Sequence, residues 1–393
     1  NTGDTVQEVF SYQMTDGQLG STATLTISIS GTNDAAEITG TLIGTVKEDI
    51  AGQLVTGGSL AATDVDSPAG FTPASAGGTY GRFSIAANGD WTYTLNNDSP
   101  QVQALREGDV RTETFQVATA DGTTRNITVT VLGTNEQPTV TPATATGTED
   151  PAAPIPVTLT GADIDGTVVS FTLADLPTHG ILYLDAAMTR PVVAGTALPT
   201  GTGSLTLYFQ PDANWNGDTA FHFTASDNNG GSSATGTASI GITAVNDAPV
   251  AANDSGAVTE DTTLNVSATN GLITSTATPA GTDRDIDGDT LTVTAIRTGA
   301  ESASGTAGTV GTAITGTYGT LTVQADGSYT YVANRADALA AGAPATDVFT
   351  YTVSDGTTTD TAELVINVTG TNDAAQITGT LIGTVKEDIA GQL

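Results

Sequence analysis

Apolar and polar residues alternate with a period of two in many short stretches of the chain. In 91–95 (WTYTL), 127–131 (ITVTV) and 349–353 (FTYTV), every second residue is apolar and the residues between are threonine. This alternation predicts β-strands with one buried face. Asn-Gly or Asp-Gly pairs stand at 88–89, 121–122, 326–327 and 355–356, where glycine supplies the positive φ that tight hairpins need. Because no long amphipathic helix is apparent, the pattern predicts an all-β protein.

The sequence also repeats itself at a long period. Residues 35–54 (AAEITGTLIGTVKEDIAGQL) and 374–393 (AAQITGTLIGTVKEDIAGQL) differ at one position, at an offset of 339 residues. The same offset relates 9–17 (VFSYQMTDG) to 348–356 (VFTYTVSDG). The chain therefore covers slightly more than one period of a tandem array.

Within this period a short polar signature follows the last strand of each unit. It reads GTND at 31–34, GTNE at 133–136, VND at 245–247 and GTND at 370–373. These signatures delimit a first repeat at 35–136, a second at 137–247 and a third at 248–373, each of ordinary domain size. Residues 1–34 are then the C-terminal part of a preceding repeat, and residues 374–393 the N-terminal part of a following one. Short strands and frequent turns in a repeat of about 100 residues indicate an antiparallel, immunoglobulin-like β-sandwich.

The charge balance narrows the functions that are possible. The chain has 43 Asp and Glu residues against 10 Lys and Arg, a formal net charge of -33. This excludes nucleic acid as a partner, because a phosphate backbone needs a basic surface, and it disfavours anionic membranes. The absence of cysteine excludes disulfides, thiol catalysis and Cys-based zinc sites. No apolar run is long enough for membrane insertion. A folded chain this acidic either tolerates self-repulsion or recruits cations.

The acidic residues recur in the same order in every repeat. An Asn-Asp or Asn-Glu junction is followed 13 or 14 residues later by Glu-Asp, then by an Asp-x-Asp segment, and a further Asp stands in the last hairpin turn. Asp-x-Asp in an extended segment sends both carboxylates to one side. The candidate ligands are Asp16, Asn33, Asp34, Glu48, Asp49, Asp64, Asp66, Asp121, Asn135, Glu136, Glu149, Asp150, Asp163, Asp165, Asp227, Asn246, Asp247, Glu260, Asp261, Asp283, Asp285, Asp287, Asp355, Asn372, Asp373, Glu387 and Asp388.

Calcium is the cation that fits these ligands best. It takes about six to eight oxygens in a loose geometry, from carboxylates, amide side chains and backbone carbonyls. The lack of Cys and the scarcity of His, of which the chain has two, argue against zinc and other metals that prefer softer ligands. Residues 283–289 (DRDIDGD) resemble the start of an EF-hand loop, but the twelfth position of that loop is Thr294 and flanking helices are not expected. The alternative is that the acids are solvated loop residues.

Together these motifs resemble the extender region of giant bacterial surface adhesins, of the RTX type, found in biofilms. The TGTND endings and the NGDWTYTL and DGSYTYV hairpins of the first and third repeats are similar to VCBS repeats. The second repeat, with GTEDPAAPIPVTLTGADIDG, NWNGDTAFHFTASDNNG and AVNDAP, is similar to bacterial cadherin-like repeats. The resemblance implies cadherin-like sandwiches, Ca²⁺ at the junctions between repeats, and a location outside the cell on a bacterial surface. Glu136 replaces the usual Asp at one junction.

The sequence offers no coherent catalytic set. His222 alternates with two phenylalanines on a predicted strand and is expected to face solvent, while His179 lies in a predicted turn. Paired acids resemble glycosidase carboxylates, but they recur at every junction instead of meeting once in a cleft. Trp91 is in phase with Tyr93 and is expected in the core, and Trp215 in the NWNG turn is also expected to be structural.

We therefore predict a stalk segment without catalytic activity, which projects a distal binding domain. Its partners are the neighbouring repeats, and other cells or surface glycans are reached through regions outside this segment. Three alternatives stay open: a glycan-binding or peptide-binding sandwich, a structural subunit of an extracellular filament or surface layer, and an enzyme with one unique polar cleft.

Overall fold

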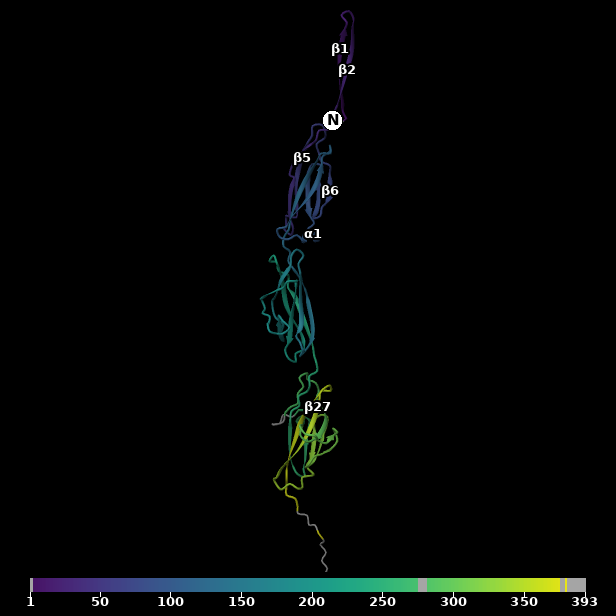
Figure 1. Cartoon of the computed structure of the whole chain (residues 1–393). Coiled ribbons are helices and arrows are strands. Elements are labelled where there is room, and N and C mark those ends of the chain that lie inside the picture. Colours follow the sequence, from purple (N-terminus) through teal and green to yellow (C-terminus); the bar gives the residue numbers. More distant parts are fainter. Residues whose placement is uncertain (1–2, 275–280, 375–378, 380–393) are drawn as a thin grey trace, which may run out of the picture. The chain divides into compact units, whose positions relative to one another are not determined.

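The computed structural model describes residues 3–274, 281–374 and 379 (Figure 1). It divides into two compact bodies, Asn1–Thr243 and Ala244–Leu393. β-Strands make up nearly all of the regular structure, and the helical elements of the described residues are the short α1 (Pro100–Gln103) and a 3₁₀ turn at Ala268–Asn270. The all-β sandwich fold expected from the alternating pattern is thus confirmed.

A two-stranded hairpin precedes the first repeat. Its strands β1 (Thr5–Thr15) and β2 (Gly20–Ser30) pair antiparallel along their whole length. Apolar side chains such as Phe10 and Ile27 are exposed on it, whereas the matching Phe349 and Ile366 of the third repeat are fully buried. The hairpin therefore carries the same alternation of apolar residues as the matching strands of the third repeat.

The first repeat packs two sheets around one core. One sheet has the order β3-β5-β8-β7-β6 and the other β4-β10-β9. Trp91, Tyr93 and Phe83 lie between them and are at most 2% exposed. The strands are β3 (Glu37–Gly40), β4 (Ile43–Lys47), β5 (Val55–Thr63), β6 (Ala74–Gly77), β7 (Gly81–Ile85), β8 (Asp90–Leu95), β9 (Val110–Ala118) and β10 (Thr124–Leu132).

The second repeat is built in the same way around Phe171, Phe209, Phe221 and Phe223. Its sheets have the orders β11-β13-β17-β15 and β12-β19-β18-β14-β16. The strands are β11 (Thr139–Thr141), β12 (Ala143–Thr148), β13 (Ile155–Ala162), β14 (Val168–Leu173), β15 (Gly180–Tyr183), β16 (Ala197–Pro199), β17 (Ser204–Pro211), β18 (Gly217–Asp227) and β19 (Gly236–Thr243).

The third repeat buries Tyr331, Phe349 and Tyr351 between its sheets. Among its described residues the sheet orders are β20-β28-β27-β22-β23 and β21-β26-β25-β24. The strands are β20 (Asp254–Thr259), β21 (Thr263–Val266), β22 (Thr292–Thr298), β23 (Ala307–Gly308), β24 (Ile314–Thr315), β25 (Thr320–Val323), β26 (Tyr329–Val332), β27 (Pro344–Ser354) and β28 (Thr359–Thr369).

Each repeat also contains a parallel strand pair, which the sequence pattern did not predict. The pairs are β4 with β10, β12 with β19, and β20 with β28. In the first repeat, β3 pairs with β5 in one sheet before the chain crosses to the other sheet as β4. Gly40 makes this crossing at φ 118°, where a Cβ atom would overlap the carbonyl oxygen of Ser59. In the second repeat, Pro142 lies between β11 and β12 and interrupts the strand, because proline has no N–H to donate to a neighbouring strand.

The structure also places the aromatic residues and histidines considered for catalysis. Trp91 is 1% exposed and its Nε1 donates a hydrogen bond to the Thr41 carbonyl at 2.8 Å, as expected of a core residue. The His222 side chain is exposed, as predicted, and pairs with Asp175 at 2.7 Å. Trp215 is half-buried against the core and stacks on the His179 ring at 4.9 Å.

Candidate metal centres

A Glu-Asp turn ends the parallel strand of each repeat. Its Asp has a left-handed backbone in all three, with φ of 55° at Asp49, 45° at Asp150 and 60° at Asp261. The preceding Glu donates its N–H to a carbonyl at the end of the last strand. These bonds run from Glu48 to Leu132 at 3.2 Å, from Glu149 to Thr243 at 3.0 Å and from Glu260 to Thr369 at 2.9 Å. The three Glu residues are at most 2% exposed, so each turn buries a carboxylate where its repeat ends.

The junction asparagine is held by its amide nitrogen. Asn135 Nδ2 donates to the Glu136 carbonyl and to Asp227 Oδ2, both at 3.0 Å. Asn246 makes the same two bonds, to Asp247 at 2.7 Å and to Asp355 at 2.9 Å. Asn33 repeats them with Asp34 at 2.9 Å and Asp121 at 3.4 Å. These bonds use both amide hydrogens, and the side-chain carbonyl oxygen of Asn135 is buried without a hydrogen-bond partner, so it is available as a ligand atom.

The hairpin aspartates Asp121, Asp227 and Asp355 therefore act as anchors for these asparagines. Hydrogen bonds from Thr119 and Thr123 hold the pKa of Asp121 well below its usual range. Bonds from Asn246 and Thr358 do the same for the pKa of Asp355. Burial alone would raise the pKa of Asp227, but bonds from Asn135 and from backbone N–H groups outweigh it and lower the pKa. These carboxylates stay ionised without any cation.

The group with the most buried oxygens that lack partners among the described residues, here called the central junction cluster, consists of Glu48, Asn135, Glu136, Asp163 and Asp165. Glu48 Oε1 accepts the Thr134 N–H at 2.8 Å, and Asp163 Oδ1 accepts the Asp165 N–H at 3.2 Å. The Glu48 turn belongs to the first repeat, Asp163 and Asp165 follow β13 of the second, and Asn135 and Glu136 lie between. A cleft of about 630 Å³ is lined by Asn135, Glu136 and Asp163.

Buried oxygens of this cluster lack hydrogen-bond partners. They are Glu48 Oε2, Asn135 Oδ1, both carboxylate oxygens of Glu136, Asp163 Oδ2 and both carboxylate oxygens of Asp165. A buried acceptor without a partner is strongly unfavourable, more so when it is charged. Arg106 is close, but its Nε donates to the Asp165 backbone carbonyl at 2.8 Å.

The electrostatic effect of this crowding appears in the carboxyl pKa values. Burial, followed by repulsion from Glu48 and Asp165, raises the pKa of Glu136 to about 8. Burial likewise raises the pKa of Glu48 to about 7, although the Thr134 N–H opposes the shift. Burial and the Asp163 carboxylate raise the pKa of Asp165 to about 6. Without a cation, the cluster cannot keep all of its carboxylates ionised at neutral pH.

The donor set fits a hard cation. All of its free atoms are carboxylate or amide oxygens, which are the ligands that calcium prefers. The chain has no cysteine, so no thiolate is available for a softer metal. The residues present therefore suit a calcium ion and leave little for softer metals.

A second acidic group lies at the start of the first repeat. Asp66 Oδ1 accepts the Asp34 N–H at 3.3 Å, and Asp64 Oδ1 accepts the N–H groups of Asp66 at 2.9 Å and Ser67 at 2.8 Å. The second carboxylate oxygens of Asp64 and Asp66 are buried and lack partners. The Asp-x-Asp turn thus uses one oxygen for its own backbone and leaves the other free for an ion.

The third repeat starts with a matching group. Asp287 Oδ2 accepts the Asp247 N–H at 2.8 Å, and Asp285 Oδ1 accepts the N–H groups of Asp287 at 3.0 Å and Asp289 at 3.3 Å. One carboxylate oxygen from each of Asp285, Asp287 and Asp289 lies within 4.8 Å of the others. Like charges at this spacing repel unless a cation lies between them.

At the other end of the third repeat, Glu260, Asp261, Asn372 and Asp373 come together. Glu260 Oε1 accepts the Thr371 hydroxyl at 3.1 Å, while Glu260 Oε2 is buried and has no partner. Desolvation, with repulsion from Glu260, Asp261 and Asp337, raises the pKa of Asp373. The predicted ligands Glu387 and Asp388 lie outside the described residues.

Comparison with known families agrees with this architecture. The family model of the bacterial cadherin-like domain matches residues 33–133 and 246–370, more than half of the chain. The chain belongs to the bacterial cadherin-like domain family. The intervening segment, residues 135–241, matches the bacterial Ig domain. Bacterial cadherin-like domains are thus present, as the sequence suggested, but their family model matches the first and third repeats, whereas the second repeat, compared above with cadherin-like repeats, matches an Ig domain. A VCBS-type assignment of the first and third repeats stays a prediction.

Solved structures with the same fold include eukaryotic cadherins. Extracellular cadherin domains 1–5 of protocadherin gamma B2 match with a TM-score of 0.54 and 14% identity, covering 94% of this chain and 67% of that one. Domains EC22–24 of mouse cadherin-23 match with a TM-score of 0.49 and 13% identity, covering 86% of this chain and 99% of that one. At 14% identity the likeness to protocadherin gamma B2 concerns the fold alone. No curated protein matches the chain. In the part that the structure describes, no helix is long and apolar enough to cross a membrane.

Several predicted ligands of this cadherin-like chain have other partners in the structure. Asp16 Oδ1 accepts the N–H groups of Gln18 and Leu19 within the exposed β1–β2 turn. Asp49 Oδ1 accepts the amides of Asn97 and Gln103, and Asp150 Oδ1 accepts the Asn214 N–H. Their role as ligands stays a prediction.

Asp283 is also not part of the Asp285 group. Its carboxylate accepts the Tyr351 hydroxyl at 3.1 Å and the Ala252 N–H at 2.8 Å, beside the buried Asp254. Burial raises the pKa of Asp254 to about 7 and that of Asp283 to about 6. Asp283 thus faces the core side of its loop, and its role as a ligand is untested.

Sequence reasoning missed some residues of these groups. Asp289 continues the Asp-x-Asp spacing of 285 and 287 by one step, so the pattern itself could have included it. Arg106 follows α1 in the first repeat, and Asp337 follows β26 in the third repeat. Neither residue belongs to a junction motif. Only the return of the last strand brings them close to Asp373 and Asp165.

Proposed function

We propose that this chain is a calcium-rigidified extender segment of a bacterial cell-surface adhesin, without catalytic activity. It would project a distal binding domain outside the cell, for adhesion or biofilm formation. The repeats at 35–136, 137–247 and 248–373 would each be one sandwich of the array, joined to their neighbours through the acidic junctions. Other cells or surface glycans would be contacted by regions outside this segment.

The observation that carries the proposal is the central junction cluster. Its buried oxygens without partners come from both repeats of one compact body and from the linker between them. Glu48 would hold the ion from the first repeat, Asp163 and Asp165 from the second, and Asn135 and Glu136 from the linker. A bound calcium ion would supply the positive charge that these oxygens lack.

Such an arrangement links calcium to the angle between two repeats. A linker restrained only by its backbone can bend. Ligands from both repeats can reach the same ion only when the two repeats keep one relative orientation. The local anchors support this, because Asn135 is held by Asp227 and Asp165 by Arg106. Sites with millimolar or submillimolar affinity would fill outside the cell, where calcium is abundant, and stay nearly empty in cytoplasm.

Isothermal titration calorimetry of the whole chain with CaCl₂ tests the binding. We expect saturable calcium binding with a dissociation constant of about 0.1–1 mM. The double variant Asp163→Asn/Asp165→Asn should lose one class of sites, whereas Asp218→Asn, which removes one exposed charge on β18, should leave the isotherm unchanged. Absence of calcium binding by the native chain would rule out the proposal.

The rigidifying role needs a separate measurement. Because the chain has no cysteine, Thr92→Cys/Thr158→Cys allows spin labels on exposed strand positions of the first and second repeats. Electron–electron double resonance should give a narrow distance distribution in 5 mM calcium, on the order of tenfold above the expected site affinity, and a broad one after chelation. Equal widths in both conditions would show that calcium binds without stiffening the junction.

A further inference from the structure

One strand edge of the first repeat is left without a partner. β9 is the last strand of the order β4-β10-β9. On the outer side of β9, the described residues pair with the chain only near the C-terminal end of this strand. There Phe71 bridges Thr119, and the Thr72 N–H bonds to the Ala118 carbonyl at 2.9 Å. Backbone groups of alternate residues point the same way along a strand. The N–H and C=O groups of Thr112, Thr114 and Gln116 therefore face the same open side as the Ala118 carbonyl.

The third repeat shows what covers this edge. Its β27 corresponds to β9, since Asp347 and Glu113 both accept N–H groups of a Gly-Thr-Tyr-Gly turn, at 316–319 and 78–81 respectively. β27 is not an edge, because β22 pairs with it antiparallel from Thr292 to Thr298 and β23 follows outside. Phe71, which bridges Thr119, corresponds to Val293, which pairs with Val353. The segment from Phe71 to the turn at 78–81 is 16 residues shorter than the segment from Val293 to the turn at 316–319. The first repeat lacks the segment that forms this added strand.

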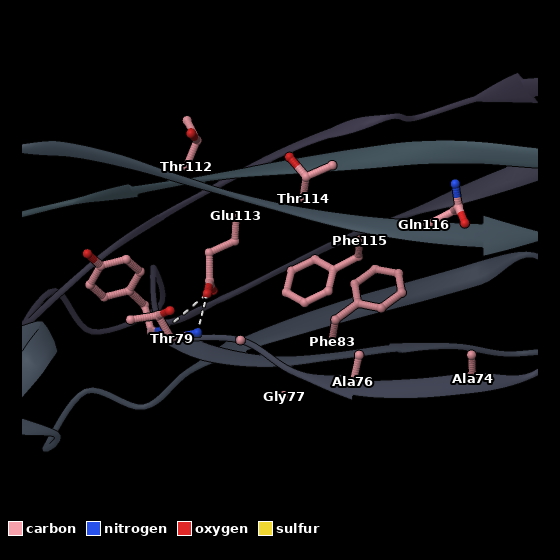
Figure 2. A pocket seen from close by; sticks show the side chains of 12 residues that line it. Ala74, Ala76, Gly77, Thr79, Phe83, Thr112, Glu113, Thr114, Phe115 and Gln116 are labelled. Atoms are coloured by element: carbon pink, nitrogen blue, oxygen red, sulfur yellow. Dashed lines mark hydrogen bonds between the residues drawn. The ribbon is translucent and has the colours of Figure 1, made fainter.

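The missing strand leaves a groove. A cavity of about 620 Å³ lies between β9 and β6, lined by Ala74, Ala76, Phe83, Thr112, Thr114 and Phe115 (Figure 2). Figure 2 shows the rings of Phe83 and Phe115 between the two strands, stacked with centroids 4.7 Å apart. The rings themselves are buried, Phe83 at 2% and Phe115 at 8% exposed, and the small side chains of β6 leave space beside them. The groove therefore has a backbone edge and a lining of small side chains over a buried aromatic pair.

The walls of the groove are tied together. The Glu113 carboxylate, on β9, accepts the N–H groups of Thr79 (Figure 2) and Tyr80 in the turn that follows β6. It also accepts the Tyr93 hydroxyl. Gly78 is needed for the contact with the turn, because a Cβ atom there would overlap the carboxylate. A pre-formed groove loses little conformational entropy when it binds a partner.

We propose that the groove between β9 and β6 binds an extended segment of a partner protein, which adds to β9 as an antiparallel strand. Backbone hydrogen bonds to Thr112, Thr114 and Gln116 would supply the attachment, and alternate apolar side chains would point at Phe83 and Phe115. This interaction is independent of the acidic junctions and of calcium.

The occupant's chemistry follows from the strand that fills the same place in the third repeat. Residues 290–299 (TLTVTAIRTG) contain no acid and one arginine, and Val293 and Ile296 are at most 3% exposed. A net charge of -33 repels acidic segments and attracts basic ones. A second copy of this acidic chain is disfavoured for the same reason. Its own β9 is also held in a sheet, so its side chains cannot enter the groove.

The probe for this interaction is a fluorescein-labelled synthetic peptide with the sequence of residues 290–299. Added to the whole isotopically labelled chain, it should slow amide hydrogen exchange at Thr112, Thr114 and Gln116. Glu113 and Phe115 should change little, because their N–H groups face β10. Absence of this alternating protection at saturating peptide would overturn the proposal.

Matched variants locate the site by fluorescence anisotropy. Ala76→Trp fills the groove and should weaken peptide binding by about tenfold or more. Ser75→Trp is the control, since the neighbouring side chain does not line the groove and accepts a hydrogen bond from Arg82 instead. Thr114→Pro removes one edge N–H in a position where proline is tolerated, and should also weaken binding about tenfold. Equal affinity of Ala76→Trp and Ser75→Trp would refute the site.

The second-copy alternative has a distinct outcome. Sedimentation equilibrium of the native chain without peptide should give a monomer. A dimer that Thr114→Pro converts to monomer would show that the occupant is another β9 edge, and would overturn the partner-segment proposal.

Discussion

Replacing Glu136 by glutamine should stabilise the first two repeats in chelator, and calcium should then add less stability to the variant than to the native chain. Glutamine keeps the shape and one oxygen but removes the charge. In chelator the charge destabilises the folded state, because burial and then the Glu48 and Asp165 carboxylates raise the pKa of Glu136 from 4.5 to about 8. In calcium the same charge is a ligand. The size of the effect therefore depends on the ion.

The magnitude in chelator follows from linkage. The folded pKa lies above the unfolded one, so the penalty is absent below about pH 4.5 and grows as the pH rises to about 8. At pH 7 it amounts to roughly 3 kcal/mol, at about 1.4 kcal/mol per pH unit. Because Glu48 relaxes when Glu136 becomes neutral, we expect Glu136→Gln to stabilise by about 1–3 kcal/mol, a rise in melting temperature of several degrees.

In saturating calcium the expected gain in stability shrinks, because the variant binds the ion more weakly. A tenfold loss of calcium affinity removes about 1.4 kcal/mol of linked stability. Differential scanning calorimetry at pH 7 would measure the stability in 5 mM EDTA and in 5 mM CaCl₂. This calcium concentration is on the order of the one that fills sites of extracellular modules. Glu8→Gln is the matched control, since Glu8 is exposed on β1, and it should change stability by less than about 0.5 kcal/mol in either condition. A shift of equal size in both conditions would refute a cation at this cluster.

Three further predictions concern the sandwiches themselves. Asp347→Ala should destabilise the third repeat by about 3 kcal/mol in urea titrations, with or without calcium, because buried donors including the Tyr331 hydroxyl lose their acceptor; a loss seen only in chelator would contradict this. Asp254→Asn should stabilise the same repeat at pH 8 but not at pH 4.5 in chelator melts. Burial raises the folded pKa of Asp254 from 3.8 to about 7, so its ionisation is unfavourable only at the higher pH; equal effects at both pH values would count against it. Gly40→Ala should cost about 2 kcal/mol or more of stability by circular dichroism, because φ is 118° and the added Cβ meets the Ser59 carbonyl; a neutral effect would show that β3 and β4 can cross differently.

Much of the candidate site could be predicted from the order of residues along the chain. The Glu-Asp pair at 48–49 and the Asn-Glu pair at 135–136 mark positions that the structure brings to one junction, and the Asp-x-Asp at 163–165 joins them there. The anchoring role of Asp227 could not be predicted, because it depends on where the last hairpin returns. The spacing of Asp283 suggested a ligand, but its loop turns the side chain toward Tyr351 instead.

The sequence by itself determined the strands, the repeats and the all-β class. Strand alternation and turn glycines are local, because each follows from which side chains a few neighbouring residues bury. Tertiary structure alone decided the parallel pairing of β4 with β10 and the convergence of carboxylates that lie far apart in the chain. It also decided that β9 is an open edge while β27 is covered. That difference arises from 16 residues between two otherwise matching strands, and their absence becomes a groove only when both sheets are in place.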